Sequence, residues 1–394
     1  MAHFHRFNQV KKRLSELHSS EKYIVGINIS FGFHFQHIRG IYNQLKKYPE
    51  IHVVFIVPFR NPTDPKTYLL MRKIPREDII PYSFLQSCKE LSLFFTPCNS
   101  NYVPLHPSTI KVIYAHGLAG WGNGKSTLGI ENILNYDYVF TTGPAQEQVI
   151  TGFLKKHQPS ILPKLVPVGY SISDPFFTKF KEFDREGYLK NIGLDPRKKT
   201  VIYAPSWGEE SSGVSAGLKI ISKLCISGRR NILVKLHSAQ LFGRSRKKEF
   251  SVTGNIDWIQ ELDKFTQKFQ CLRHIIDMGD FGHLYAADIM ITDISGIGFE
   301  FLLLGKPVIY IDVPEYFKKY GKDGPEYWAR TGIIVHGIDK IEMAIEECEK
   351  NHQLYANERK KIISKLIYNP GTASERVARE ISAILKIPSM VDYG

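Results

Sequence analysis

The feature that most constrains the fold is the repeated alternation of short apolar segments with longer segments of helical periodicity. An apolar run at 23–30, a helical stretch at 38–48 and a second apolar run at 51–57 give the order strand, helix, strand. This order favours a parallel sheet, because parallel neighbours need a crossover connection. The further predicted strands lie at 91–96, 110–116, 136–143, 200–206, 231–238, 274–278, 287–293 and 306–312.

A segment rich in Pro, Gly and Ser at 167–181 separates two such series and is the expected linker. The sequence therefore predicts an α/β protein with two Rossmann-like, doubly wound parallel-sheet lobes that face a cleft. The predicted domains are an N-terminal acceptor-side lobe at 1–172, a nucleotide-donor lobe at 173–370, and a C-terminal helix within 371–394 that packs back toward the first lobe. Thr372 or Ser374 is the expected N-cap of that helix.

Charge and composition exclude several classes of protein. Lys and Arg number 52 against 39 Asp and Glu, and this net charge of +13 favours anionic partners. No apolar run approaches the roughly 18 residues of a membrane span, and no apolar segment follows the first basic residues as in a secretory signal. The five cysteines show no Cys-x-x-Cys spacing, so neither a disulfide framework nor a structural zinc site is expected.

The first 20 residues show apolar positions at helical spacing with basic residues between them. We expect a helix that packs on the first lobe and is solvated on its other face. The alternative is attachment of this basic amphipathic helix to a membrane surface. The expected location is cytoplasmic, either free or peripheral on the inner face of the cell membrane.

Ligands of open parallel sheets bind beyond the carboxyl ends of the strands, so the residues that follow each strand are the site candidates. The strand at 287–293 ends with Thr292 and Asp293. Ser295 and Gly296 then open a helix whose first amides can bind phosphate oxygens. Glu300 follows in the same helix, where a carboxylate can accept from a ribose hydroxyl. The structural alternative is a simple tight turn between strand and helix.

Two more strand ends in the second lobe carry polar side chains. Lys235 and His237 lie on the same side of their strand and would suit a pyrophosphate. Ser206 and Trp207 follow the strand at 200–204, where contact with a nucleobase or a phosphate competes with a plain surface loop.

In the first lobe, His116 and Gly117 end the strand at 110–116. A histidine at this edge could act as general base on an incoming hydroxyl. His34, His37 and Arg39 lie close together in the loop after the first strand. No further ligand completes a metal site around them, and we expect this loop to recognise the acceptor substrate or, alternatively, the second lobe.

These elements, in this order, resemble the CDP-glycerol glycerophosphotransferase family of wall teichoic acid synthesis, which has the two-lobed GT-B fold. The matching segments are Ala115-His116-Gly117, Ala204–Trp207, Lys235–Ser238, Thr292–Ser295, Lys306-Pro307 and Ser374-Glu375-Arg376. Ile294-Ser295-Gly296 departs from the family's Tyr-Ser-Ser and loses one hydroxyl, and Ser238 replaces a proline.

The resemblance implies a transferase that moves a polyol-phosphate, such as glycerol phosphate, from a CDP-activated donor to a hydroxyl of a lipid-linked or polysaccharide acceptor. It implies that His116 takes the proton of the acceptor hydroxyl, and that His237 and the amides at Ser295 and Gly296 stabilise the leaving nucleotide. No metal or other cofactor is expected. An anionic membrane surface is a further expected partner, since a lipid-linked acceptor would lie there.

Two alternatives remain from the sequence. The segment 295–300 followed by Leu-Gly-Lys-Pro-Val also resembles nucleotide-sugar glycosyltransferases and UDP-N-acetylglucosamine 2-epimerases, although 311–317 lacks the epimerase's Thr-Glu-Arg-Pro-Glu segment. A basic, non-catalytic nucleic-acid-binding protein is the alternative of another class. No RNA-recognition signature is present, so no nucleic acid is expected. The sequence does not determine the oligomeric state or the donor's polyol.

Overall fold

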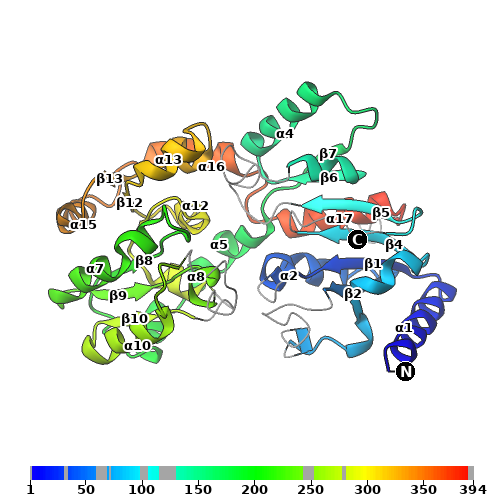
Figure 1. The fold of residues 1–394 in the computed structure, drawn as a ribbon, viewed down its shortest axis with the longest axis horizontal. Coiled ribbons are helices and arrows are strands. Elements are labelled where there is room, and N and C mark those ends of the chain that lie inside the picture. Colours follow the sequence, from blue (N-terminus) through cyan, green and yellow to red (C-terminus); the bar gives the residue numbers. More distant parts are fainter. Residues whose placement is uncertain are drawn as a thin grey trace. The chain divides into compact units, whose positions relative to one another are not determined.

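The computed structural model describes residues 2–30, 34–58, 69–70, 72–97, 105–114, 130–242, 253–276 and 281–388, and of 2–7 and 242 only the backbone. The chain divides into two compact units (Figure 1). Unit 1 holds the described residues up to Pro175 and from Leu366 onward, and unit 2 holds Phe176–Lys365. Each unit contains one parallel sheet.

Unit 1 is built on a seven-stranded sheet with the order β3-β2-β1-β4-β5-β6-β7. The strands are β1 (Tyr23–Asn28), β2 (Ile51–Val57), β3 (Ile79–Pro81), β4 (Leu91–Thr96), β5 (Ile110–Tyr114), β6 (Tyr138–Thr141) and β7 (Lys164–Pro167). Its helices are α1 (Ala2–Ser19), α2 (His34–Leu45), α4 (Pro144–His157) and α17 (Ala373–Ile384), with short 3-10 helices at η1 (Arg76–Asp78), η2 (Tyr82–Ser87), η4 (Ile130–Asn135) and η5 (Ser171–Ser173).

Helices cover both faces of this sheet, which explains why its central strands are apolar on both sides. One core contains residues of α2 and α17, including Ile38, Ile41 and Val377. The other core contains residues of α1 and α4. Val10, Leu14 and Leu17 of α1 are buried there, at the helical spacing that the sequence shows.

Unit 2 is built on a six-stranded sheet with the order β10-β9-β8-β11-β12-β13. The strands are β8 (Thr200–Tyr203), β9 (Asn231–Val234), β10 (Leu272–His274), β11 (Ile289–Thr292), β12 (Val308–Ile311) and β13 (Ile333–Val335). The helices are α5 (Asp174–Thr178), which begins in unit 1, and α6 (Arg185–Asn191), α7 (Ser212–Ile226), α8 (Ser238–Phe242), α10 (Trp258–Lys268), α11 (Gly282–Ala286), α12 (Gly296–Leu302), α13 (Pro314–Tyr320), α14 (Pro325–Trp328), α15 (Ile341–Lys350) and α16 (Ala356–Leu366), with 3-10 helices η6 (Phe180–Glu182) and η8 (Ile338–Lys340).

The strand order decides where a ligand can bind. When the strands are numbered from the first strand of each unit, both sheets contain the Rossmann order 3-2-1-4-5-6. The sheet of unit 1 adds a seventh strand, β7, after the sixth. The chain reverses its direction of progress between β1 and β4 in unit 1, and between β8 and β11 in unit 2. Crevices at the carboxyl ends of such strand pairs are the usual ligand sites of open α/β sheets.

Most strands lie where the apolar runs predict them, and three were not predicted. β3, β7 and β13 have only three or four residues each, and β7 buries a single one of its four side chains. β10 ends at His274, whereas the predicted strand begins there. Residues 277 and 278 of that predicted strand lie outside the described part of the chain.

The segments that connect the two units are held on unit 1 by polar contacts. The carboxylate of Asp174 accepts hydrogen bonds from the amides of Ala373 (3.0 Å) and Ser374 (2.7 Å), the first residues of α17. Thr372 is the N-cap residue, as predicted, but its side chain makes no capping bond. The Tyr368 amide donates to the Thr142 carbonyl at 2.7 Å. A side-chain carbon at Gly143 would lie 2.1 Å from the Leu366 carbonyl oxygen, so this approach requires glycine.

We predict that Asp174→Ala destabilises unit 1 by about 1–2 kcal/mol, because two helix-start amides lose their acceptor. Asp174→Asn keeps one acceptor oxygen and should cost less. Denaturant titration followed by circular dichroism measures both, with the exposed Asp339→Asn as the control. A value for Asp174→Ala equal to that control would contradict the capping role.

Candidate functional site

The carboxyl ends of β8, β9 and β11 bring most of the predicted second-lobe residues to one edge of the sheet. β8 pairs with β9 on one side and with β11 on the other, all in parallel. The loops that leave these three strands therefore emerge side by side. They carry, in order, Ser206 and Trp207, then Lys235 and His237, and then the segment 293–296.

The buried side chain of Asp293 holds loops of this edge together. Its side chain is 1% exposed. Oδ1 accepts from the amides of Ser206 (2.7 Å) and Ile294 (2.6 Å). Oδ2 accepts from the amide and the hydroxyl of Ser212, both at 2.8 Å. Burial raises the pKa of Asp293 above its ordinary value, and these four hydrogen bonds oppose the rise.

The bonds of Asp293 all go to the protein, so its carboxylate joins the loop after β8, the start of α7 and the loop after β11. Thr292 acts in the same way. It is fully buried, and its hydroxyl donates to the Ala204 carbonyl at 2.7 Å. Its methyl group packs beneath Gly298, where a side-chain carbon would come within 3.2 Å. Both residues were predicted at the ligand site, and both lie under its surface.

The next residues lie at the surface. Gly296 is exposed, and a side-chain carbon there would meet no atom within 4 Å. Ser295 is the N-cap of α12, and its hydroxyl makes no capping bond. Glu300 lies on α12 and is half-buried. The turn thus presents the backbone of Gly296 to open space, beside the half-buried Ser295.

Trp207 and His237 form an aromatic pair across the ends of β8 and β9. Their ring centroids are 5.7 Å apart and the planes differ by 27°, a stacked arrangement. Trp207 is 37% exposed and His237 is also exposed. Nδ1 of His237 accepts from the Ala239 amide at 3.1 Å. The neutral ring therefore carries its proton on Nε2, which makes that atom a hydrogen-bond donor.

Lys235 is half-buried, and its ammonium donates to the Leu236 carbonyl at 3.4 Å. The sequence analysis missed a second group beside it, His283 of α11. Burial, with the Lys235 charge as the second cause, lowers the pKa of His283 to about 3, so this ring stays neutral at physiological pH. A lone histidine inside a short helical segment gives no sequence signal of this contact.

In unit 1, the predicted acceptor residues divide into a buried and an exposed group. Burial lowers the pKa of His34 to about 4, and its ring lies 6.4 Å from that of His37. Arg39 is exposed. The His37 carbonyl accepts from the Ser171 hydroxyl at 3.0 Å, which fixes α2 to the segment that leads into unit 2. His116 and Gly117 lie outside the described residues.

A polar network that was not predicted lies at the carboxyl ends of β1 and β4. Asn28 is fully buried, and its amide donates to the Thr96 hydroxyl at 3.0 Å. The Tyr82 hydroxyl donates to the Asn28 side-chain oxygen, and Ser30 lies 3.1 Å from the Tyr82 hydroxyl. These residues are spread over three segments, so their meeting has no local signature.

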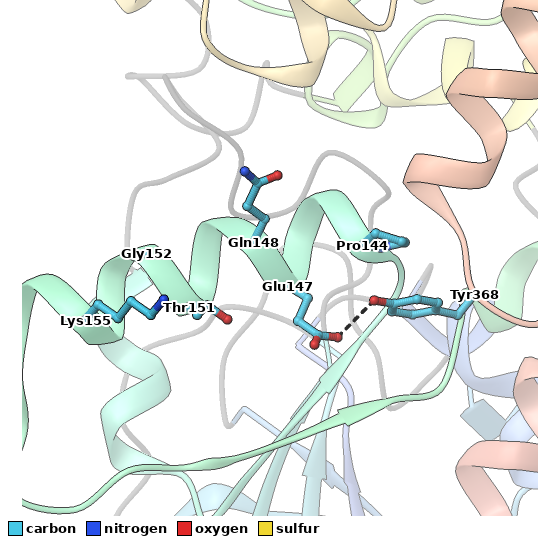
Figure 2. Close-up of a pocket in the computed structure, with 7 residues that line it drawn as sticks. All are labelled: Pro144, Glu147, Gln148, Thr151, Gly152, Lys155 and Tyr368. Atoms are coloured by element: carbon cyan, nitrogen blue, oxygen red, sulfur yellow. Dashed lines mark hydrogen bonds between the residues drawn. The ribbon is translucent and has the colours of Figure 1, made fainter.

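A pocket of about 420 Å³ lies on α4 beside Tyr368 (Figure 2). Glu147 accepts from the hydroxyls of Tyr368 (3.1 Å) and Thr141 (3.3 Å). Burial, followed by the Glu147 charge, raises the pKa of Tyr368 to about 12, so this phenol remains a donor. Gln148, Thr151 and Lys155 continue the polar lining along α4.

Over the described ranges, no three His, Cys, Asp or Glu side chains gather closely enough to hold a metal ion. None of the helices in the part of the chain that the structure describes is long and apolar enough to span a bilayer.

The sequence model of the family described as CDP-Glycerol:Poly(glycerophosphate) glycerophosphotransferase matches residues 120–383. The chain belongs to this family. The match covers all of unit 2 and the part of unit 1 that holds α4 and most of α17. It confirms the family that the sequence motifs indicate.

Curated relatives support the same assignment over shorter stretches. The chain is 28% identical over 163 residues to the teichoic acid glycerol-phosphate primase of Bacillus subtilis, which is 40% of this chain and 36% of the relative. It is 26% identical over 152 residues to the teichoic acid poly(glycerol phosphate) polymerase of Bacillus spizizenii, which is 38% of this chain and 36% of the relative. Little more than a third of each relative's length is matched.

Solved structures confirm the fold class. The wall teichoic acid polymerase TagF matches with a TM-score of 0.62 and 14% identity, covering 93% of this chain and 89% of the other. The UDP-GlcNAc 2-epimerase of Neisseria meningitidis matches with a TM-score of 0.54 and 12% identity, covering 92% and 100%. At these identities the likeness shows the fold alone. The fold is of the GT-B type, with two parallel-sheet α/β units.

We predict that Asp293→Ala lowers the free energy of unfolding by about 2–4 kcal/mol, because it leaves buried donors at Ser206 and Ser212 without an acceptor. Asp293→Asn should also destabilise, since one oxygen becomes an NH₂ group that faces donors. Denaturant titration measures both, with Asp323→Asn at an exposed position as the control. A loss no larger than that of the control would refute the organising role of Asp293.

Proposed function

We propose that this protein is a transferase that moves a polyol-phosphate group, of the glycerol phosphate type, from a CDP-activated donor to a hydroxyl of a lipid-linked or polysaccharide acceptor in cell-wall glycopolymer synthesis. The observation that carries the proposal is the edge of unit 2 at β8, β9 and β11. There a stacked Trp207–His237 pair and the open turn at Gly296 lie on adjacent loops, in a chain of the glycerophosphotransferase family.

Each predicted donor-site residue above Thr292 and Asp293 has a role that its chemistry allows. The Trp207 ring offers a face for stacking, with the neighbouring Ser206 as a further contact. Lys235 and the Nε2 proton of His237 suit the diphosphate oxygens. The Ser295 hydroxyl and the Gly296 amide suit the distal phosphate. These groups hold the donor without a metal ion, and Glu300 is assigned to the ribose hydroxyls.

Thr292 and Asp293 take a positioning role in this proposal. Their hydrogen bonds already go to Ala204, Ser206 and Ser212, so they fix the loops that bind the donor rather than the donor itself. The proposed domains keep the donor on unit 2 and the acceptor on unit 1.

The proposed reaction is an in-line displacement at the distal phosphorus of the donor. An acceptor hydroxyl gives its proton to His116 while its oxygen bonds to phosphorus, and the bond from phosphorus to the CMP oxygen breaks. His237 donates a hydrogen bond to the leaving CMP and stabilises its growing charge. On the acceptor side, the buried, neutral His34 and the neighbouring His37 suit hydroxyl groups, and the exposed Arg39 suits an acceptor phosphate.

The decisive experiment measures CMP release from CDP-glycerol in the presence of a glycerol-phosphate-primed acceptor. We expect His237→Ala and His116→Ala each to lower kcat/KM by about 100-fold or more. His336→Ala is the matched control, because this histidine also lies in unit 2, is exposed and pairs with Asp312. Full activity of His237→Ala would refute the proposed site, and turnover of UDP-sugars in place of CDP-glycerol would refute the proposed donor.

A binding experiment tests the donor site without catalysis. Saturating CDP-glycerol should raise the melting temperature of the protein by about 5 °C or more, because a ligand that binds only the folded state stabilises it by mass action. Trp207→Ala should weaken this shift, whereas His116→Ala should retain it. Trp328→Phe, at a half-buried tryptophan on α14, controls for loss of an indole elsewhere in unit 2. An equal or larger shift with UDP-GlcNAc would favour the epimerase-like alternative.

A further inference from the structure

One surface of unit 1 combines exposed aliphatic side chains with unpaired positive charge. It is the loop between α4 and β7, residues 158–163, which we call the α4–β7 tip (Figure 1). Ile161 is 80% exposed and Leu162 is 63% exposed. Single exposed aliphatic residues are ordinary, but two adjacent ones at the end of a loop call for an explanation.

The backbone fixes this tip in place. Gln158 ends α4 in the left-handed conformation (φ 42°), and its amide donates to the Leu154 carbonyl at 2.9 Å. Pro159 and Pro163 flank the exposed pair and restrict the chain on both sides. Pro163 is buried against the unit. Exposure of Ile161 and Leu162 therefore follows from an anchored loop that points them outward.

Basic side chains surround the tip. Lys155, Lys156 and His157 form the last turn of α4, and Lys164 begins β7, all of them exposed. Among the described residues, no carboxylate pairs with any of the three lysines. Lys164 lies over the ring of Tyr138, 6.0 Å from its centroid.

Other exposed aliphatic residues have a different electrostatic setting. Ile226, at the end of α7, is 73% exposed, and the following Arg229 and Arg230 are bound by Glu342 and Glu349. Met343 is 64% exposed on the same acidic helix, α15. Exposure alone therefore does not distinguish the α4–β7 tip; its uncompensated positive charge does.

An open pocket lies beside the tip. It has a volume of about 660 Å³, and its lining combines apolar residues of α4, the tip and β7 (Leu154, Pro159, Leu162, Pro163 and Leu165) with the polar Thr151, Lys155 and Gln158. Lys155 also lines the polar pocket beside Tyr368. An acyl chain and an anionic headgroup match this combination of apolar lining and a lysine.

We propose that the α4–β7 tip docks the protein on an anionic lipid bilayer. Ile161 and Leu162 enter the acyl region, and the lysines lie at the level of the headgroup phosphates. A second copy of this chain is disfavoured as the occupant. A symmetric contact would bring two sets of these lysines together in a protein of net charge +13.

The tip lies at the edge of the sheet opposite the predicted acceptor residues. Tyr138 of β6 pairs with Lys164 of β7, so the tip lies at the amino ends of the strands. The predicted acceptor residues follow the carboxyl ends. The 14 residues of α4 span about 21 Å between the two edges. In α1, by contrast, the apolar residues Val10, Leu14 and Leu17 are already used in the core.

Vesicle co-sedimentation of the full chain, without any substrate, tests this inference. The protein should sediment with vesicles of phosphatidylglycerol and phosphatidylcholine, and less with phosphatidylcholine alone or at high salt. The double variant Ile161→Asp with Leu162→Asp should lower the partition coefficient by about tenfold or more. Lys155→Glu with Lys156→Glu should abolish the preference for anionic vesicles. Ile226→Asp, equally exposed, should bind as the unchanged protein does.

Circular dichroism and melting temperature establish that the variants are folded, which exposed positions should allow. Vesicle binding that survives the double aspartate variant would overturn the inference. An equal loss in Ile226→Asp would overturn it as well. Sedimentation velocity adds a third outcome: a dimer that the double variant dissociates, without vesicle binding, would assign the tip to self-association instead.

Discussion

The candidate site depends on one buried carboxylate. Asp293 receives four hydrogen bonds from the loop after β8, the start of α7 and its own loop after β11. Unsatisfied, these donors would each carry a desolvation cost inside the unit. Because one side chain accepts from all of them, their hydrogen bonds hold the three segments in a single arrangement. This arrangement fixes the positions of the loops that carry Trp207 and Gly296.

This arrangement separates the groups that hold the site from the groups that can touch a ligand. Thr292 and Asp293 are buried and directed into the protein, whereas Ser295 is half-buried and Gly296 is exposed. Three residues after the buried Asp293, the chain thus reaches Gly296, which can contact a ligand. His237 shows a related division within one ring, since Nδ1 is engaged by the Ala239 amide and Nε2 carries the proton of the neutral form.

Sequence reasoning was strongest where the signal is local. The strands β1, β2 and β11 could be predicted because a parallel strand is covered by helices on both faces of its sheet. Its side chains are then apolar on both sides, and the sequence shows a continuous apolar run. The short strand β7 was not predicted, because two of its four residues are exposed and only Val166 is buried. Residues that follow predicted strands, such as Trp207 and His237, were found for the same reason, since the topology brings strand ends to one edge.

Contacts between distant segments could not be predicted in this way. Ser206 and Ser212 reach Asp293 over more than 80 residues of sequence, and nothing in either segment marks the partner. Asp174 was seen only as part of a linker, although it caps α17 some 200 residues later. The pairing of Glu147 with Tyr368 is equally non-local. Such contacts depend on the completed fold, which periodicity and spacing do not encode.

The place of α17 in unit 1 has a consequence for the order in which the chain folds. Val377, Ala378, Ile381 and Leu385 complete one core of unit 1, and they leave the ribosome only after all of unit 2 has been made. The described part of unit 2, Phe176–Lys365, is a single stretch of the chain and can assemble as soon as it emerges. During synthesis, the face of the unit 1 sheet that packs on α17 is therefore covered only in part, by α2, in the period when nascent chains are most exposed to aggregation and to chaperones.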